Sequence, residues 1–323
     1  MEDLKAREDG TNDVKKKKRA RATPVEDEDV FGAAAKRVSK VTEDDGGDDA
    51  EKEEATTVPA VKRQRKGGVK NPALIGRKFT GGANASMFIR QWAWKREMKT
   101  DEERFELDYE HECVDAKGGR HELRFKQSKF DAHGFASTVW DSSIVMAKYL
   151  ERHREALGKR AKSACEIGAG CGVATCVLAL SCGIDRVVAT ELNEDNLELL
   201  RENCSRLPDD VAARIECKKL KWGDAADVES LGAPTAPFFD LVVATDVVYY
   251  EDAMEDLVAT LEAISEPKKT RILFSYGRNR QALGKFLRLV EGKFDVAEVP
   301  RDECDPLYQC TDVDVIELTR CSV

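Results

Sequence analysis

The chain has 323 residues, which is long enough for one large domain or two small ones. Its hydrophobic content of 41% can supply a core, and its formal net charge of −9 argues against binding bulk nucleic acid through the folded part. No stretch has the roughly 20 apolar residues of a membrane helix, and the N-terminus lacks the apolar core of a secretory signal. Ten cysteines form no CxxC pair, which indicates reduced thiols. We therefore expect an intracellular protein, cytoplasmic or nuclear or both.

The N-terminal region, about residues 1–75, is rich in charges of both signs, and its first seventy residues contain a single aromatic, Phe31. Such a segment cannot bury enough apolar area to offset its ordering entropy, so we predict a disordered tail. Two basic clusters, Lys15–Arg21 and Lys62–Lys66, could be nuclear-import signals, contacts for a polyanion or simply part of a solvated tail.

Residues 76–135 are predicted to form an extension that precedes the main domain. Order is expected to begin between Lys70 and Phe79. Polar and apolar residues alternate over Arg104–Val114 and again over Glu122–Gln127, with a Gly-Gly turn between them. This pattern predicts a β-hairpin. A loop that ends at Trp140 follows, and Asp141 or a nearby serine is expected to cap a helix that runs to Leu150.

Residues 136–323 alternate strand and helix patterns from this first helix onward. Strands are predicted at 163–167, 186–191, within 213–222, and at 238–245, 271–276, 294–299 and 313–318. Helices are predicted at 172–180, 195–207, 252–264 and 281–291. The run at 238–245 is continuously apolar, as in a parallel strand buried on both faces. The sequence therefore predicts a doubly wound α/β fold with a mostly parallel, Rossmann-like sheet of about seven strands that ends in an antiparallel pair.

The motif with the most chemical content is Glu166–Gly172, Glu-Ile-Gly-Ala-Gly-Cys-Gly, where the first predicted strand meets its helix. We call it the glycine turn. The dinucleotide fingerprint GxGxxG/A fails here, because its third position is Val173 or Thr175. No phosphate-binding GxxxxGK[ST] loop occurs either. The acid at the start of the turn suits a cationic ligand better than a pyrophosphate.

The glycine turn, followed by an acid at the end of the second strand, resembles the seven-stranded S-adenosylmethionine (SAM) methyltransferases. More narrowly, Thr138–Glu151, Leu220–Asp224 and Asp240–Tyr249 resemble the family 16 methyltransferases, which are methyltransferase-like protein-lysine methyltransferases. The match runs from about residue 122 to 320. The resemblance implies SAM as the cofactor. Its implied binding residues are Trp140, Glu166, Gly168, Ala169, Gly170, Glu191, Trp222 and Thr245.

Several of these roles have a physical basis. The carboxylate of Glu191 can accept hydrogen bonds from both hydroxyls of a ribose. The indoles of Trp140 and Trp222 offer flat faces for an adenine or a cation. Thr245 departs from the alanine that is common in the family at this position, and it adds a hydroxyl.

The segment Asp246–Tyr249, Asp-Val-Val-Tyr, bears on the substrate. Enzymes that methylate base amines usually carry [Asp/Asn]-Pro-Pro-[Tyr/Phe] here, and the two prolines are absent. Asp-x-x-Tyr resembles the lysine-modifying group, which implies a protein substrate. Asp246 is expected to orient the incoming nitrogen, and Tyr249 to line the lysine channel. Two alternatives stay open, namely another acceptor (histidine, a protein N-terminus or a small amine) and a non-catalytic SAM-binding module. We expect a monomer, and no metal, because the four histidines lack ligand spacing.

Overall fold

We describe a computed structural model of the chain over residues 94–129, 134–232 and 238–322. The predicted tail at 1–75, the onset of order at 70–79 and both basic clusters lie outside these residues. Within them, no helix is long and apolar enough to cross a membrane.

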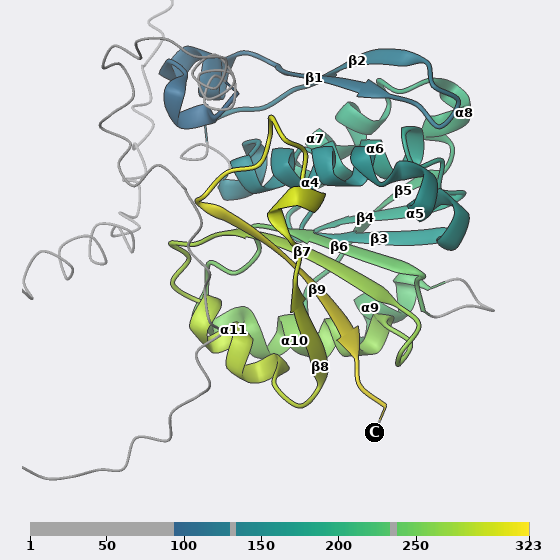
Figure 1. Ribbon diagram of the computed structural model, residues 1–323, viewed down its shortest axis with the longest axis vertical. Helices are drawn as coiled ribbons and strands as arrows, with labels where there is room; N and C mark the ends of the chain where they lie inside the picture. The colour runs from purple at the N-terminus through teal and green to yellow at the C-terminus, as the bar shows by residue number, and fades with distance from the viewer. Residues whose placement is uncertain (1–93, 130–133, 233–237, 323) are drawn as a thin grey trace, which may run out of the picture. The chain divides into compact units, whose positions relative to one another are not determined.

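A seven-stranded sheet forms the centre of the described part of the chain, as predicted (Figure 1). Its order is β5-β4-β3-β6-β7-β9-β8, and all neighbours are parallel except the pairs that β9 makes with β7 and β8. The direction of winding reverses between β3 and β6, and ligands of open α/β sheets bind at such a switch point. The strands are β3 (Ser163–Ile167), β4 (Arg186–Glu191), β5 (Ile215–Lys219), β6 (Leu241–Thr245), β7 (Arg271–Gly277), β8 (Phe294–Glu298) and β9 (Val313–Arg320).

Helices cover both faces of this sheet (Figure 1). The helices on one face are α4 (Asp141–Arg152), α5 (Arg154–Arg160), α6 (Val173–Leu180), α7 (Glu194–Cys204) and α8 (Asp209–Ala212). Those on the other are α9 (Ala225–Leu231), α10 (Met254–Ile264) and α11 (Leu283–Val290). The short helices α5, α8 and α9 were not predicted, because they have only seven, four and seven residues, and one or two turns leave little periodicity in a sequence. The helix at α4 was predicted, but its cap was wrong: Trp140 is the N-cap, and Asp141 Oδ1 instead accepts a hydrogen bond from the backbone N–H of Arg96.

The predicted hairpin is present as β1 (Tyr109–Val114) and β2 (Arg120–Phe125), and it lies outside the helix layer that contains α6 and α7 (Figure 1). Its first strand starts later than predicted, because residues 102–106 form a π-type helical turn. The local cause is a reciprocal cap: Thr100 N–H donates to the Glu103 carboxylate, and Glu103 N–H donates to the Thr100 hydroxyl. The Thr100–Glu103 pair is visible in the sequence, but the alternation of polar and apolar residues at 104–108 favoured a strand.

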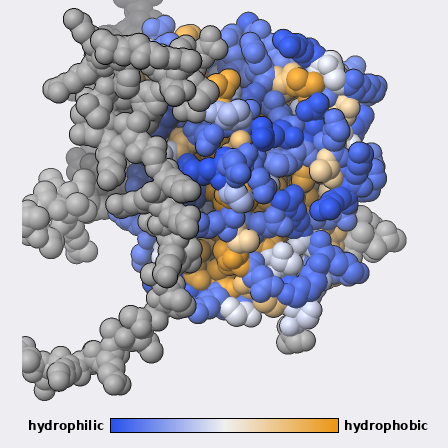
Figure 2. All heavy atoms as spheres, viewed as in Figure 1, coloured by the Kyte–Doolittle hydropathy of each residue, from blue (hydrophilic) through white to orange (hydrophobic). Residues whose placement is uncertain are grey.

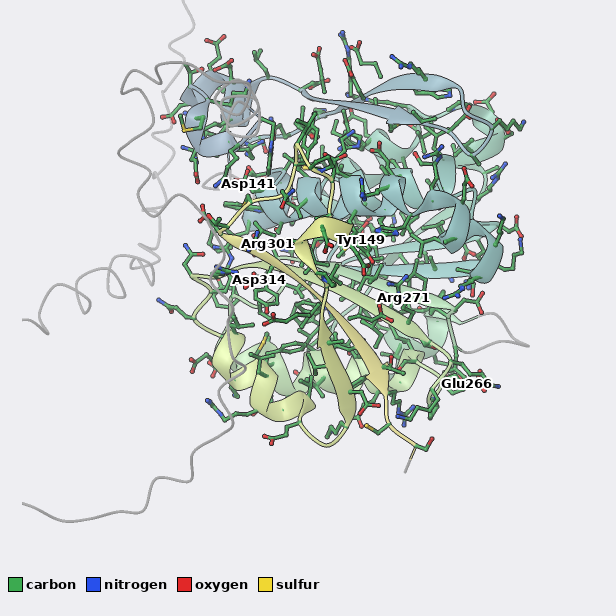
Figure 3. All side chains as sticks on the ribbon, viewed as in Figure 1. Asp141, Tyr149, Glu266, Arg271, Arg301 and Asp314 are labelled. Atoms are coloured by element: carbon green, nitrogen blue, oxygen red, sulfur yellow. The ribbon has the colours of Figure 1, made fainter. Side chains whose placement is uncertain are left out.

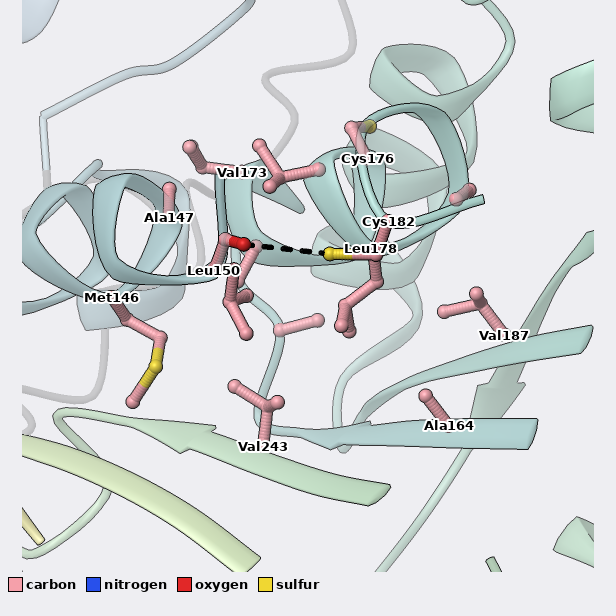
Figure 4. Close-up of a cluster of buried hydrophobic side chains, with 14 of the residues drawn as sticks. Met146, Ala147, Leu150, Ala164, Val173, Cys176, Leu178, Cys182, Val187 and Val243 are labelled. Atoms are coloured by element: carbon pink, nitrogen blue, oxygen red, sulfur yellow. Dashed lines mark hydrogen bonds between the residues drawn. The ribbon is translucent and has the colours of Figure 1, made fainter. Parts of the chain in front are cut away.

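The core has two parts, one on each face of the sheet. Figure 4 shows the part between α4, α6 and the sheet, where Leu150, Leu178 and Val243 pack together and Cys182 Sγ lies 3.7 Å from the carbonyl oxygen of Leu150. The predicted buried stripe of α10 is confirmed, and it belongs to the part on the opposite face. All ten cysteines are free thiols and most are buried. The face in Figure 2 is mostly hydrophilic, with apolar side chains in small groups.

Candidate active site

The glycine turn connects β3 to α6 at the switch point. Gly168, Gly170 and Gly172 all have positive φ, at 63°, 54° and 83°. A Cβ at Gly170 would lie 2.9 Å from the backbone oxygen of Ala136, and one at Gly172 would lie 2.7 Å from Leu200 Cδ1. Both the backbone conformation and the close packing therefore require glycine. The turn directs the Gly170 N–H toward the end of β4, where it donates to the carboxylate of Glu191.

Glu166 does not face an open site. Its side chain is fully buried, and its carboxyl accepts a hydrogen bond from the Thr175 hydroxyl on α6. Burial raises the pKa of Glu166 to about 8. Its Oε1 atom has no hydrogen-bond partner in the described structure. Glu166 therefore braces the turn between β3 and α6, and its contact with the cofactor stays a prediction.

Glu191 ends β4 beside the turn. Its Oε1 accepts a 2.6 Å hydrogen bond from Gly170 N–H, and its Oε2 accepts one of 3.3 Å from Leu192 N–H. The backbone of Ala169 also reaches β4, since its N–H donates to the Thr190 carbonyl at 2.9 Å. Burial raises the pKa of Glu191 despite these hydrogen bonds. The structure thus brings together the turn and the strand-end acid that the sequence pattern linked, with the carboxylate held by the turn backbone.

The two candidate tryptophans lie at different parts of this edge. Trp222 follows β5 and borders the glycine turn, since a Cβ at Gly168 would lie 3.8 Å from Trp222 Cζ2. Trp140 precedes α4, and its Nε1–H donates to the carbonyl of Phe135 at 2.8 Å. The guanidinium carbon of Arg280 lies 5.6 Å from the centre of the Trp140 ring. Trp222 is therefore associated with the glycine turn, and Trp140 with the end of β7.

Asp246 follows β6, where Thr245 is the last residue of the strand and is 9% exposed. The backbone of Asp246 has a φ of 59°, which is uncommon for a residue other than glycine. Its N–H donates to the Ser275 carbonyl of β7 at 2.8 Å. Such strained conformations persist only where the surroundings hold them, and they often occur at functional sites.

Arg280 holds the Asp246 carboxylate, and sequence reasoning missed it. Arg280 Nε donates to Asp246 Oδ1 at 2.6 Å, while Nη2 donates to Oδ2, so the pair is bidentate. Gly277 N–H adds a 3.3 Å hydrogen bond to Oδ1. Asp246 in turn raises the pKa of the Arg280 guanidinium, which stays charged. The signal that could have found it is the adjacency of β6 and β7, which places the loops after both strands side by side.

Tyr249 lies at the mouth of the site. Its ring is in edge contact with Phe135 and Tyr250, at centroid distances of 5.7 Å and 4.7 Å, and the residue is 38% exposed. Burial raises the pKa of Tyr249 to about 12, and the charges of Glu191 and Asp246 add to this effect. The Asp246–Tyr249 loop also contacts the glycine turn, because a Cβ at Gly168 would lie only 3.0 Å from Val247 Cγ1.

A cavity of about 540 Å³ opens beside Asp246, Trp140 and Arg280. Five segments line it: residues 96–105, the start of α4, Asp246 after β6, the loop after β7 and the residues at the start of β9. Figure 3 labels Asp141 at the start of α4 and Asp314 at the start of β9. Asp314 receives a bidentate pair from Arg278, at 2.7 and 2.5 Å, and a 3.4 Å contact from Arg301. The wall next to Asp246 is therefore built from ion pairs.

Known proteins share this sequence pattern. The sequence model of a family described as lysine methyltransferase matches residues 117–293. The protein N-lysine methyltransferase METTL21A of Mus musculus is 33% identical over 173 residues, which cover 52% of this chain and 73% of the relative. The protein-lysine methyltransferase METTL21E of Mus musculus is 30% identical over 186 residues, covering 55% and 70%.

Solved structures with a similar chain trace include the glycopeptide N-methyltransferase MtfA complexed with sinefungin. Its TM-score is 0.41 at 17% identity, over 54% of this chain and 94% of that one. An O-methyltransferase from Bacillus cereus has a TM-score of 0.38 at 20% identity, over 54% and 80%. The family match over more than half of the chain, together with the curated relatives, settles the membership: the chain belongs to the lysine methyltransferase family.

Proposed function

We propose that this protein transfers a methyl group from SAM to the side-chain amine of a lysine in a protein substrate, at the edge where the glycine turn meets the Asp246–Tyr249 loop. The proposal rests on the contact between the glycine turn and the Asp246–Tyr249 loop. Val247 packs against Gly168, and the charge of Glu191 acts on Tyr249. A methyl donor on the turn and an amine at the loop would therefore be neighbours, as a direct transfer requires.

The residues at the turn fit SAM in chemical type. Glu191 offers a carboxylate for a vicinal diol, and Trp222 offers an aromatic surface next to Gly168. Gly168, Ala169 and Gly170 present backbone rather than side chains to the ligand. Trp140 and Thr245 border the side nearer to Asp246. When bound, SAM supplies an electrophilic methyl group on a positively charged sulfur.

The chain's own residues act on the amine. A lysine amine has a pKa of about 10.4 in solution, so it must lose a proton before its lone pair can react. Asp246 accepts a hydrogen bond from the neutral amine and directs its lone pair. The nitrogen then bonds to the methyl carbon as the carbon–sulfur bond breaks, and the electron pair of that bond stays on sulfur. Tyr249 and Phe135, in edge contact with each other, offer an aromatic surface for the aliphatic part of the lysine side chain.

The partner is a protein, as the names of the relatives suggest for this family. The cavity of about 540 Å³ beside Asp246 is the entrance for the lysine and its flanking residues. Its lining combines arginines with carboxylates, which suits a polar protein surface better than a nucleic-acid backbone. We further propose a monomer that works in the cytoplasm or the nucleus or both.

The test is incubation of the protein with methyl-labelled SAM and a cell extract that is separated afterwards into protein and RNA. The proposal predicts discrete labelled protein bands that require active enzyme. Label found only in the RNA fraction, or only in small molecules, would contradict it. A sample in which Asp246 is replaced by alanine controls for contaminating methyltransferases from the expression host.

A further inference from the structure

We propose that Arg280 is a positioning residue that neutralises the charge of Asp246, so that Asp246 can orient a lysine amine without holding it in its protonated, unreactive form. This inference rests on the proposed function and extends it. A lone carboxylate next to the amine would favour the ammonium ion, which has no lone pair to attack with. Pairing with Arg280 offsets the negative charge of Asp246, so the nearby amine can lose its proton.

The geometry allows both roles at once. Arg280 binds the two carboxylate oxygens of Asp246 from one side, and Gly277 N–H adds to Oδ1. A carboxylate has about four lone-pair sites, so one remains for an amine N–H after these three contacts. The Trp140 ring, 5.6 Å from the guanidinium carbon, backs the arginine and limits its movement. The pair is mostly buried, with side-chain exposures of 26% for Arg280 and 6% for Asp246.

Most other charges around the pair have a partner of their own. The exceptions are Asp141 and Arg96, whose Nη1 donates to the neutral amide oxygen of Gln127. Arg278 is bound to Asp314, and the carboxylates of Glu97 and Asp312 both contact Lys95, at 2.8 and 2.7 Å. Arg96 and Arg104 flank the ring of Phe105. Asp141 acts on Arg280, but its pKa is raised by burial. The remaining charge near the Asp246–Tyr249 loop is Glu191, which acts on Tyr249. Arg280 is the group that touches Asp246 and can cancel its charge.

The acid limb of kcat against pH reports the protonation of groups in the complex with substrate. Removing the positive charge in Arg280→Gln leaves Asp246 unbalanced, so the amine holds its proton to higher pH. A unit charge 6–8 Å away at an effective dielectric of about 20 corresponds to a shift of roughly one to two pH units. The acid limb of Arg280→Gln should therefore lie roughly one to two pH units above that of the wild type.

The experiment measures kcat from about pH 6 to pH 10 with labelled SAM and the protein band that the wild type labels most strongly. The wild type is measured in parallel with every variant, so that titration of Glu166, whose pKa burial raises to about 8, is common to all the curves. Arg280→Lys keeps the charge but not the two-point contact, so its rate should fall while its acid limb stays in place. The matched control is Arg278→Gln, which breaks another bidentate pair on the same loop and should leave the acid limb unmoved.

A second readout needs no turnover. Calorimetric titration of the acceptor protein into enzyme loaded with S-adenosylhomocysteine, in two buffers of different ionisation enthalpy, counts the protons released on binding. At about pH 9 the wild type should release more protons than Arg280→Gln. Equal proton release, with a loss of rate in Arg280→Gln that is the same at every pH, would mean that Arg280 only maintains the fold, and the inference would be overturned. If the wild type labels no protein at any pH, both proposals fall.

Discussion

The two halves of the site are built in different ways. The glycine turn with Glu191 consists of backbone and buried side chains from one contiguous β-α-β unit, held by N–H groups and close packing. The half around Asp246 is assembled from ion pairs and aromatic rings contributed by separate segments that range from residue 96 to residue 313. We call the first the rigid half, because backbone hydrogen bonds and close packing fix it, and the second the ion-paired half. This difference suggests that substitutions in the two halves will separate binding of the methyl donor from methyl transfer.

The largest expected effect is at Asp246. Asp246→Ala should lower the transfer rate by about 10²- to 10³-fold, because the amine loses the group that orients it. Its affinity for S-adenosylhomocysteine should stay within about threefold of the wild type, since Asp246 hydrogen-bonds to Arg280 and Gly277 and not to the glycine turn. Calorimetric titration and initial rates measure the two quantities. Losses of equal size in both would place Asp246 on the donor side instead.

Gly170→Ala tests the rigid half. Its φ of 54° and the backbone oxygen 2.9 Å from the new Cβ should lower the free energy of unfolding by about 3 kcal/mol. Affinity for S-adenosylhomocysteine should fall about tenfold or more, because Gly170 N–H positions Glu191. Gly118→Ala is the matched control: its φ is 92°, but nothing lies within 4 Å of the new Cβ. Chemical denaturation should show a clearly smaller loss of unfolding free energy in Gly118→Ala. Equal losses in the two variants would mean that the close contact at Gly170 does not affect stability.

Glu166 predicts a pH dependence of stability. The folded carboxyl keeps its proton up to about pH 8, whereas the unfolded one loses it near 4.5, so the folded state binds more protons in this window. Stability therefore falls as pH rises through it, by about 2 kcal/mol between roughly pH 6 and pH 8. Glu166→Gln should abolish that slope and keep the Thr175 hydrogen bond. Denaturation curves at several pH values check this, and an unchanged slope in the variant would assign it to another group.

Glu191→Gln should have a smaller effect, on donor affinity alone. An amide provides one acceptor oxygen where the carboxylate provides two, so affinity for S-adenosylhomocysteine should drop about tenfold. Glu194→Gln is the control, because Glu194 is exposed on α7 and pairs only with Arg201 among the described residues. If both variants bind equally well, Glu191 does not hold the ribose.

The sequence predicted more of the rigid half than of the ion-paired half. The bounds of β3 and β4 agree with prediction, because a buried strand, a glycine run and a strand-end acid are local signals. The full burial of Glu166 was not predicted, since burial of a charged residue depends on what packs over it. Arg280 and the arginines of the cavity wall were missed for a different reason: their partners lie far away in the sequence, and only the strand order brings them together.

The short helices and the helical turn at 102–106 were not predicted, because one or two turns leave too few residues to show a helical period. Its reciprocal Thr100–Glu103 cap was a usable signal, but the alternation that followed outweighed it. The antiparallel pairing of β8 with β9 was predicted because only a loop, and no helix pattern, lies between them. That β9 inserts between β7 and β8 was not, because no local pattern specifies strand order.

The most direct test of the central claim is the position of the transferred methyl. Tandem mass spectrometry of the strongest protein band labelled by the wild type should locate the new methyl groups on a lysine Nζ, and the Asp246→Ala sample should lack them. Methyl groups on histidine, on a protein N-terminus or on RNA bases would contradict the account, because the Asp246–Tyr249 loop would then serve a different acceptor.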